Sequence, residues 1–334
     1  MSSSSIDADI ATILNNATNQ INRYISLVVF IFGIIGNILN IFVFLHRTLR
    51  SNSCSLLFLT ASIGNIITII SGLITRMLSG WSADLTNTID WLCKLRIVVL
   101  WTSRTFVMWI LMLTTIDRWL SSSIHVHYRQ KTTLKNAYRG IFLVLLFSII
   151  LNIDLLYCYQ ANLLNTPLKC YSKTEICRLI TDFTYALIIY TIPLISMTLF
   201  GLAIIKTIRQ MHHRRVQPIV TTETPNGLQT VNIPIDNLKQ KKKIDRRLLR
   251  MHLIQVFILC TLNLPAAIQR LYSTLTINND KSLIQLSIEN LLFNVVIHLN
   301  YISSGITFYI FTLYGGKLFR NAFWDLMKNI LFIK

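Results

Sequence analysis

The sequence predicts an all-α fold in which seven helices cross a membrane and a short amphipathic eighth helix follows. Hydrophobic residues make up 53% of the 334 residues and charged residues only 14%, against about 25% charged in an ordinary soluble domain. Seven apolar runs of about 20 residues or more are long enough to span a bilayer. The net charge of +18 lies mainly between these runs, which favours membrane topology over nucleic-acid binding as its cause.

The predicted spans divide the chain into three parts. Residues 1–23 form a polar amino-terminal tail, residues 24–314 the spanning domain, and residues 315–334 an amphipathic helix on the inner leaflet with a short tail. The longest polar interval of the spanning domain, 207–247, separates the fifth and sixth spans. The spans are 24–46, 55–78, 92–117, 139–160, 183–206, 248–272 and 288–314.

Basic residues predict the orientation of the chain in the membrane. With the amino terminus outside, roughly two-thirds of the Lys and Arg residues face the cytoplasm, which is the positive-inside pattern. We therefore expect a multi-pass plasma-membrane protein with an extracellular amino terminus and a cytoplasmic carboxy terminus. Asn16 begins an Asn-Ala-Thr sequon in the amino-terminal tail and is a candidate glycosylation site; a chance match explains it equally well.

The third span carries more charge than a lipid-facing helix tolerates. An arginine at the centre of a spanning helix costs roughly 2.5 to 3.5 kcal/mol on insertion scales, so this helix belongs inside a bundle. Cys93 lies at its outer end and Asp117-Arg118-Trp119 at its inner end. This pattern resembles the third helix of rhodopsin-like (class A) G-protein-coupled receptors, where the closing motif is usually Asp-Arg-Tyr.

Other spans extend the resemblance. Asn37 follows a glycine in the first span, and Asn65 lies in the second span at the distance that the family uses between its first two helix anchors. The family usually has an aspartate that binds sodium at the second anchor, and a neutral Asn65 argues against such a site. A simpler interpretation is hydrogen bonding across packed helices, worth about 0.6 kcal/mol. Pro193 and Pro265 match the fifth- and sixth-helix prolines, the latter displaced by two residues.

The resemblance implies a G-protein switch at Asp117, Arg118 and Trp119. In the family, the arginine pairs with its neighbouring acid and sometimes with an acid on helix six, for which Asp245 is the candidate if Pro265 sets the register. Helix six swings outward on activation, and the released arginine meets the G protein. From the residues alone, Arg118 could instead extend to lipid phosphates.

Four cysteines are expected near the oxidising outer face, where disulfides form: Cys93, Cys158, Cys170 and Cys177. Four cysteines allow three pairings. The resemblance implies a bond from Cys93 to the second outer loop, with Cys170 as the first candidate and Cys177 as its rival. Cys158 and Cys177 form a second bridge or stay reduced.

The outer halves of the second, third and sixth spans carry the predicted ligand-binding arginines: Arg76, Arg96, Arg104 and Arg270. Guanidinium groups bind carboxylates through paired hydrogen bonds, so the expected ligand has an acidic group or is a peptide that offers carbonyls and a carboxylate. The alternative is that internal acids neutralise these arginines. The candidate acids are Asp154, Asp182 and Glu289.

Two positions narrow the ligand class by resemblance. Leu100 stands seven residues after Cys93, among the ligand-facing positions, where the family's amine receptors have an aspartate, so a monoamine is not expected. Residues 288–314 contain no lysine to hold retinal, so an opsin is not expected. A faint resemblance to invertebrate neuropeptide receptors favours a peptide.

The expected partners are an extracellular ligand, a heterotrimeric G protein and membrane lipid, with no nucleic acid. No cofactor, no metal and no enzymatic activity is expected. The alternatives are a secondary transporter, or another seven-span protein that does not couple to a G protein. A transporter usually shows a duplicated half, and this sequence has no visible repeat.

Overall fold

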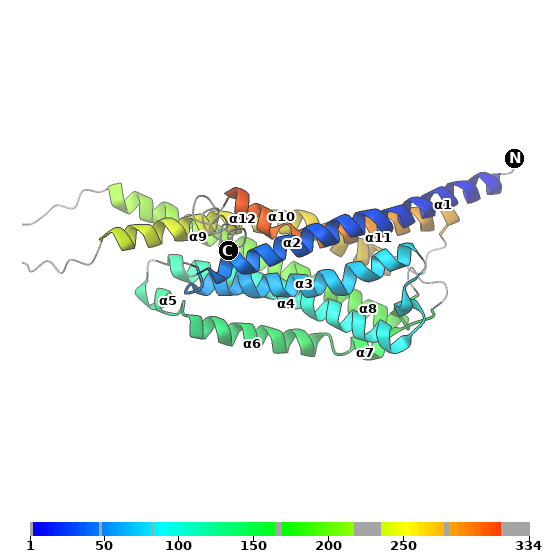
Figure 1. Ribbon diagram of the computed structural model, residues 1–334, viewed down its shortest axis with the longest axis horizontal. Coiled ribbons are helices and arrows are strands. Elements are labelled where there is room, and N and C mark those ends of the chain that lie inside the picture. Colours follow the sequence, from blue (N-terminus) through cyan, green and yellow to red (C-terminus); the bar gives the residue numbers. More distant parts are fainter. Residues whose placement is uncertain are drawn as a thin grey trace, which may run out of the picture.

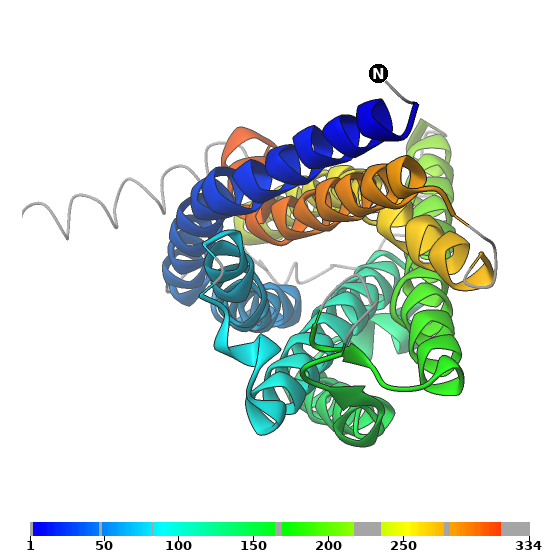
Figure 2. The ribbon, with the colours of Figure 1, turned by 90° about the vertical axis from the view of Figure 1, so that its right-hand side faces the viewer.

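The computed structural model describes residues 3–46, 49–81, 83–123, 125–163, 169–216, 235–276 and 281–314. Seven helical stretches in it are long and apolar enough to cross a membrane, and they run side by side in one elongated bundle (Figure 1). Viewed from one end, the helices form a ring (Figure 2). The predicted seven-helix fold is confirmed, whereas residues 315–334, with the predicted eighth helix, lie outside the described residues.

The first three spans are nearly uninterrupted helices. The first consists of α1 (Ser3–Gln20), the π-helix η1 (Ile21–Ile25) and α2 (Ser26–Leu45). The second and third are α3 (Ser53–Gly80) and α4 (Asp90–Ser122). The short helix η2 (Leu85–Asn87) connects α3 to α4, and α5 (Val126–Gln130) follows α4.

The remaining spans are more irregular. The fourth consists of α6 (Leu134–Leu151) and α7 (Leu155–Cys158), after which β1 (Tyr159–Gln160) pairs antiparallel with β2 (Tyr171–Ser172). The fifth consists of α8 (Glu175–Phe183), the π-helix η3 (Thr184–Thr191) and α9 (Ile192–Val216). The sixth is α10 (Ile235–Leu275), and the seventh consists of α11 (Leu283–Gly305) and α12 (Thr307–Tyr314).

Side-chain caps begin several of these helices. Asn52 accepts a hydrogen bond from the backbone N–H of Cys54 before α3, and Thr133, Thr174 and Ser282 do the same before α6, α8 and α11. Such a cap satisfies one of the backbone N–H groups that the first helical turn leaves unpaired, and it stabilises a helix by about 1 kcal/mol. Pro193 lies in the first turn of α9 and lacks an N–H, which disrupts regular α-helical pairing at the end of η3.

Two predicted polar segments are partly helical. The described part of the predicted tail, residues 3–23, is helical and runs without a break into the first span. It packs beside α11 and buries Ala11 and Thr18, which lie two turns apart on the same helical face. The interval 207–247 is likewise shortened, since α9 runs to Val216 and α10 begins at Ile235. Its middle, 217–234, lies outside the described residues.

The bundle buries polar side chains and exposes apolar ones. Asn37, Asn263 and Asn300 are almost fully buried, while Ile150 and Leu202 are well exposed. Together with a buried apolar core that includes Phe44 and Ile69, this distribution suits a lipid environment in which polar groups find partners only inside the bundle.

The first and seventh spans approach one another very closely. A Cβ added to Gly305 would lie 2.8 Å from the Gly33 Cα, so the two backbones are in direct contact. Small residues at such crossings allow close helix packing in membranes.

Candidate ligand and G-protein sites

Two disulfides gather chain segments at one end of the bundle. Cys93 on α4 bonds to Cys170 beside β2, and Cys158 at the end of α7 bonds to Cys177 on α8. The Cys93–Cys170 bond is the pairing that the family resemblance implied as first candidate, ahead of Cys93–Cys177. The Cys158–Cys177 bond is the second bridge that the sequence left open. We call this end of the bundle the disulfide end.

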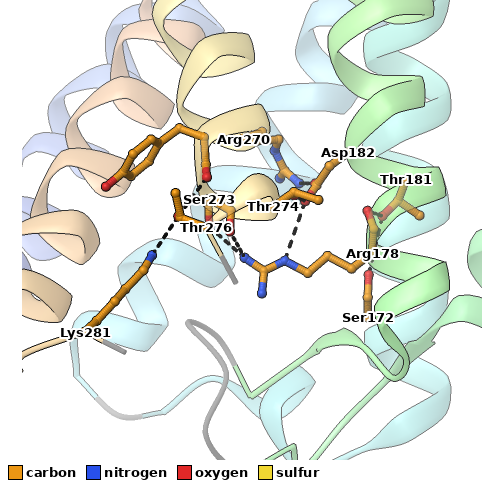
Figure 3. Close-up of polar contacts among 10 residues, drawn as sticks. Ser172, Arg178, Thr181, Asp182, Arg270, Ser273, Thr274, Thr276 and Lys281 are labelled. Carbon is orange, nitrogen blue, oxygen red and sulfur yellow. Dashed lines mark hydrogen bonds and ion pairs between the residues drawn. The ribbon is translucent and has the colours of Figure 1, made fainter. Parts of the chain in front are cut away.

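Asp182 on α8 lies at the centre of the strongest polar contact between two spans at this end (Figure 3). Its carboxylate accepts a hydrogen bond from Arg270 Nη1 at 2.8 Å and one from Thr274 Oγ1 at 2.5 Å. Arg178 Nε forms an ion pair with Asp182 at 3.8 Å, and Arg178 Nη2 donates to the carbonyl and hydroxyl oxygens of Ser273 at 3.0 and 2.7 Å. We call these five residues the α8–α10 clasp.

The clasp decides between the two interpretations of Arg270. Asp182 is 2% exposed, and a carboxylate buried to this degree requires a cationic partner. The Arg270 guanidinium also lies 4.4 Å from the ring centre of Tyr185 and 5.0 Å from that of Trp101, which adds cation–π attraction. Arg270 is therefore neutralised internally, as the alternative interpretation had it.

The other two candidate acids do not serve the arginines in this way. Glu289 accepts an ion pair from Lys281 at 2.6 Å. Asp154, at the end of the fourth span, forms no ion pair with a described residue.

Arg76 on α3 is buried and has a neutral partner. Its Nη1 donates to Asn294 Oδ1 at 2.6 Å, and its guanidinium lies 5.5 Å from the ring centre of Phe293. Asn294 in turn offers its backbone carbonyl to His298 Nδ1 at 2.7 Å, while His298 Nε2 lies 2.7 Å from Ser26 Oγ. The carbonyl can only accept, so His298 Nδ1 carries a proton and donates to it; a neutral His298 then accepts at Nε2 from Ser26.

Arg104 and Arg96, both on α4, also contact neutral groups. Arg104 Nη1 lies 3.4 Å from the Tyr185 hydroxyl, and its guanidinium lies 4.7 Å from the ring centre of Tyr301. Arg96 donates weakly to the Ser71 carbonyl and to Thr86, at 3.4 and 3.3 Å. Neither arginine is within ion-pair distance of a described carboxylate. Leu100, one turn from both, is buried and apolar.

Arg118 lies at the opposite end of the bundle, which we call the Arg118 end. It is 3% exposed, and its Nη2 donates to Asn52 Oδ1 at 2.9 Å. The same Asn52 oxygen caps α3. Asp117 accepts from the Ser53 hydroxyl at 2.9 Å through both carboxylate oxygens. The acid-arginine pair of α4 is thus joined to the first residues of α3.

Trp119 completes this end by packing between other segments. Its ring lies 5.8 Å from that of Tyr128 and 5.4 Å from that of Phe200 on α9. The side chain of Asp245, the candidate acid of the sixth span, lies outside the described side chains.

Seven spans, a cysteine-anchored third helix and a buried arginine at its far end are the geometry of a known receptor class. A family model described as "7 transmembrane receptor (rhodopsin family)" matches residues 36–306. The chain belongs to this family. It is a multi-pass membrane receptor of the rhodopsin-like G-protein-coupled class. A search of curated proteins finds no match.

The helix anchors of this receptor have different surroundings. Asn37 donates to the Gly33 carbonyl at 2.8 Å and to the Ser304 carbonyl of α11 at 3.0 Å. Asn65 is buried and makes no hydrogen bond to Asn37. Asn37 therefore forms a hydrogen bond across packed helices, but its partner is α11 and not Asn65. Asn16, in the sequon, is exposed on α1.

A buried polar chain on the fifth, sixth and seventh spans was not expected from the sequence. Asn300 donates to the Tyr190 hydroxyl and to Asn263 Oδ1, both at 2.7 Å, and Ser303 donates to the same Asn263 oxygen at 3.0 Å. Asn263 lies two residues before Pro265, which interrupts the backbone bonding of α10. The signal available in the sequence was the spacing of Asn300 and Ser303, which places them on one helical face.

Proposed function

We propose that this receptor binds an extracellular ligand with an acidic group, most simply a peptide carboxylate, at the disulfide end. On this proposal the disulfide end faces outside, and the ligand promotes opening of the sixth helix around Arg118 at the cytoplasmic face. The released Arg118 then meets a heterotrimeric G protein.

The observation that carries the ligand proposal is an imbalance of buried charge. Arg76, Arg96 and Arg104 lie within the bundle near Arg270, yet the described carboxylate of Asp182 is committed to Arg270 and Arg178. Thr86 links Arg96 to Asp84 through its hydroxyl, which bonds Asp84 at 2.7 Å. Arg76 and Arg104 have neutral partners only. A carboxylate that reached them would replace contacts with neutral oxygens by ion pairs with paired guanidinium–carboxylate hydrogen bonds.

These contacts rank the predicted ligand-binding residues. Arg76 and Arg104 are the first candidates because no described acid neutralises them. Arg270 contributes only if the ligand competes with Asp182, and Arg96 has the weakest present contacts. Leu100 adds apolar surface and no charge, which agrees with a non-amine ligand.

The proposed switch uses the hydrogen bonds at the Arg118 end. Arg118 is held by a neutral oxygen of Asn52, and Asp117 by the hydroxyl of Ser53. A hydrogen bond with one charged partner contributes about 1.5 to 3 kcal/mol, and we propose that ligand binding favours the exchange of these bonds for others. Trp119 follows Arg118 and contacts α9, and Asp245 is the proposed acid on the sixth helix.

The decisive experiment is a peptide screen on cells that express the receptor with a promiscuous G protein. Each peptide is supplied as a matched pair, with a free carboxylate and with an amidated carboxy terminus. We expect active peptides to lose at least about tenfold in potency on amidation, and Arg76→Gln to remove this difference. Lys94→Gln is the matched control, because Lys94 pairs with Asp90 near the surface of the disulfide end. Equal potency of each pair contradicts the acidic-ligand proposal. Substrate flux in proteoliposomes without nucleotide exchange would instead support a transporter.

A further inference from the structure

A group of basic side chains lies where α5 meets α6, at the Arg118 end of the bundle. Lys131 directly follows α5, and Lys135 and Arg139 lie in the first two turns of α6. All three residues are exposed. None of the three forms an ion pair with a carboxylate of the described residues. We call Lys131, Lys135 and Arg139 the basic corner.

Hydrogen bonds and helical spacing hold these three charges close together. Thr133 caps α6 by accepting from the Asn136 backbone N–H at 3.2 Å, and Asn136 Nδ2 donates to the Lys131 carbonyl at 2.8 Å. Lys131 is thereby attached to the first turn of α6. Lys135 and Arg139 are four residues apart and are therefore neighbours on the helix surface, where like charges destabilise a helix. An external anion would remove this repulsion.

The same face of α6 continues into the membrane as an apolar stripe. Tyr138, Phe142 and Leu146 are 61%, 60% and 41% exposed. At 3.6 residues per turn, these three lie with Lys135 and Arg139 within a sector of about 100°. α6 runs along the edge of the bundle (Figure 1), and its span is the least buried of the seven, at 22%. The cations thus lie where the headgroups of the lipids that cover this stripe are located.

We propose that the basic corner binds the headgroup of a polyphosphoinositide, a lipid with several phosphate groups. Arg139 offers a guanidinium fork for one phosphate, and the two lysines supply compact positive charges for others. The Tyr138 hydroxyl adds a donor between the headgroup and the acyl chains. A protein partner at the end of the bundle would leave the Phe142 face uncovered, whereas a lipid covers both parts with one molecule.

The test is binding of phosphatidylinositol bisphosphate to the full chain, purified in an uncharged detergent. A fluorophore on one acyl chain reports binding by anisotropy. Lys135→Gln, made together with Arg139→Gln, should weaken binding about thirtyfold, because each cation beside an anionic headgroup contributes about fivefold in affinity. Phosphatidylserine, with less charge, and soluble inositol trisphosphate, without acyl chains, should each compete at least about tenfold less well than the unlabelled lipid.

The matched control removes two other exposed cations from the Arg118 end, Arg50 before α3 and Lys206 on α9. Arg50→Gln with Lys206→Gln should weaken binding by less than about threefold, because salt screens charges that do not touch the headgroup. Equal losses in the two double variants would show a general basic surface and overturn the proposal. Equal competition by phosphatidylserine or by inositol trisphosphate would overturn it as well.

Two further measurements separate this site from folding and from signalling. Both double variants change exposed side chains only, so their unfolding midpoints should stay within about 2 °C of the wild type. Reduced nucleotide exchange with unchanged lipid binding in Lys135→Gln with Arg139→Gln would identify a protein contact and contradict the lipid site. The inner-leaflet location rests on the orientation proposed above, whereas the binding measurement needs neither a receptor ligand nor a G protein.

Discussion

Different kinds of bonds stabilise the disulfide end and the Arg118 end of the bundle. At the disulfide end, two covalent bridges and a buried ion pair join α4, α7, α8 and α10. At the Arg118 end, the arginine is bonded to a neutral amide and its neighbouring acid to a hydroxyl. Removing a disulfide, or one partner of a buried ion pair, costs several kcal/mol, whereas a hydrogen bond with one charged partner contributes about 1.5 to 3 kcal/mol. The comparison teaches that the disulfides of the described residues constrain one end of the bundle, and we propose that the Arg118 end is the one that rearranges.

Breaking the α8–α10 clasp should have the largest effect. Asp182→Ala leaves Arg270 and Arg178 without their carboxylate in a buried place, which costs about 3 to 5 kcal/mol of unfolding free energy. Thermal unfolding of the purified receptor measures this. Asp90→Asn, which removes the exposed pair with Lys94, should change stability by less than about 1 kcal/mol. Equal effects of the two variants would show that the clasp is not a structural element.

Removing the bridge between α4 and the β strands should have the next largest effect. Cys93→Ser, made together with Cys170→Ser, should lower stability by about 2 to 5 kcal/mol and reduce the amount of receptor at the cell surface. Cys260→Ser is the control, because Cys260 is not in a disulfide. Surface labelling and unfolding midpoints report the difference, and wild-type values for the double variant would refute it.

Alkaline pH should weaken the disulfide end specifically. Burial raises the pKa of Tyr171 on β2, and the nearby charge of Asp182 raises it further. The stability that this neutral phenol contributes is fully present below the unfolded pKa of about 10, and it is lost as pH rises above that value, by up to about 1.4 kcal/mol per pH unit. Burial also raises the pKa of Tyr159. Tyr171→Phe should therefore show a smaller fall in unfolding midpoint between pH 9 and 11 than the wild type.

Substitution of Asn52 should change stability least and should raise basal signalling. Asn52→Ala removes both the cap of α3 and the Arg118 contact. We expect about 1 kcal/mol of lost stability and a roughly fivefold rise in basal nucleotide exchange, because a bond that holds Arg118 at rest is gone. Asn52→Asp keeps an acceptor for both contacts and should keep basal exchange low. Unchanged basal exchange in Asn52→Ala would separate this bond from the switch.

The sequence predicted the spans better than their ends. Hydropathy reports which residues tolerate lipid, so it located all seven spans, but it is silent about polar helical turns outside the bilayer. Residues 3–23 are helical because they pack beside α11, a contact with a segment nearly 300 residues away. Apolar stretches therefore do not report where a helix continues beyond them.

The sequence predicted which charged residues lie in the candidate sites, but not which residues they contact. Charge within the spans identified Arg76, Arg104 and Arg118, because buried charge is rare enough to be informative. Which acid meets which arginine depends on the relative rotation of helices that are distant in sequence. The pairing of Asp182 with Arg270 joins residues 88 positions apart, and no local pattern distinguishes it from a ligand site.

The backbone contact of Gly33 with Gly305 has a consequence for motion. The first and seventh helices touch here without intervening side chains, so they have no room to move closer at this crossing. A methyl group added at Gly305 would lie 2.8 Å from the Gly33 Cα, so Gly305→Ala would require the first and seventh helices to separate at this crossing.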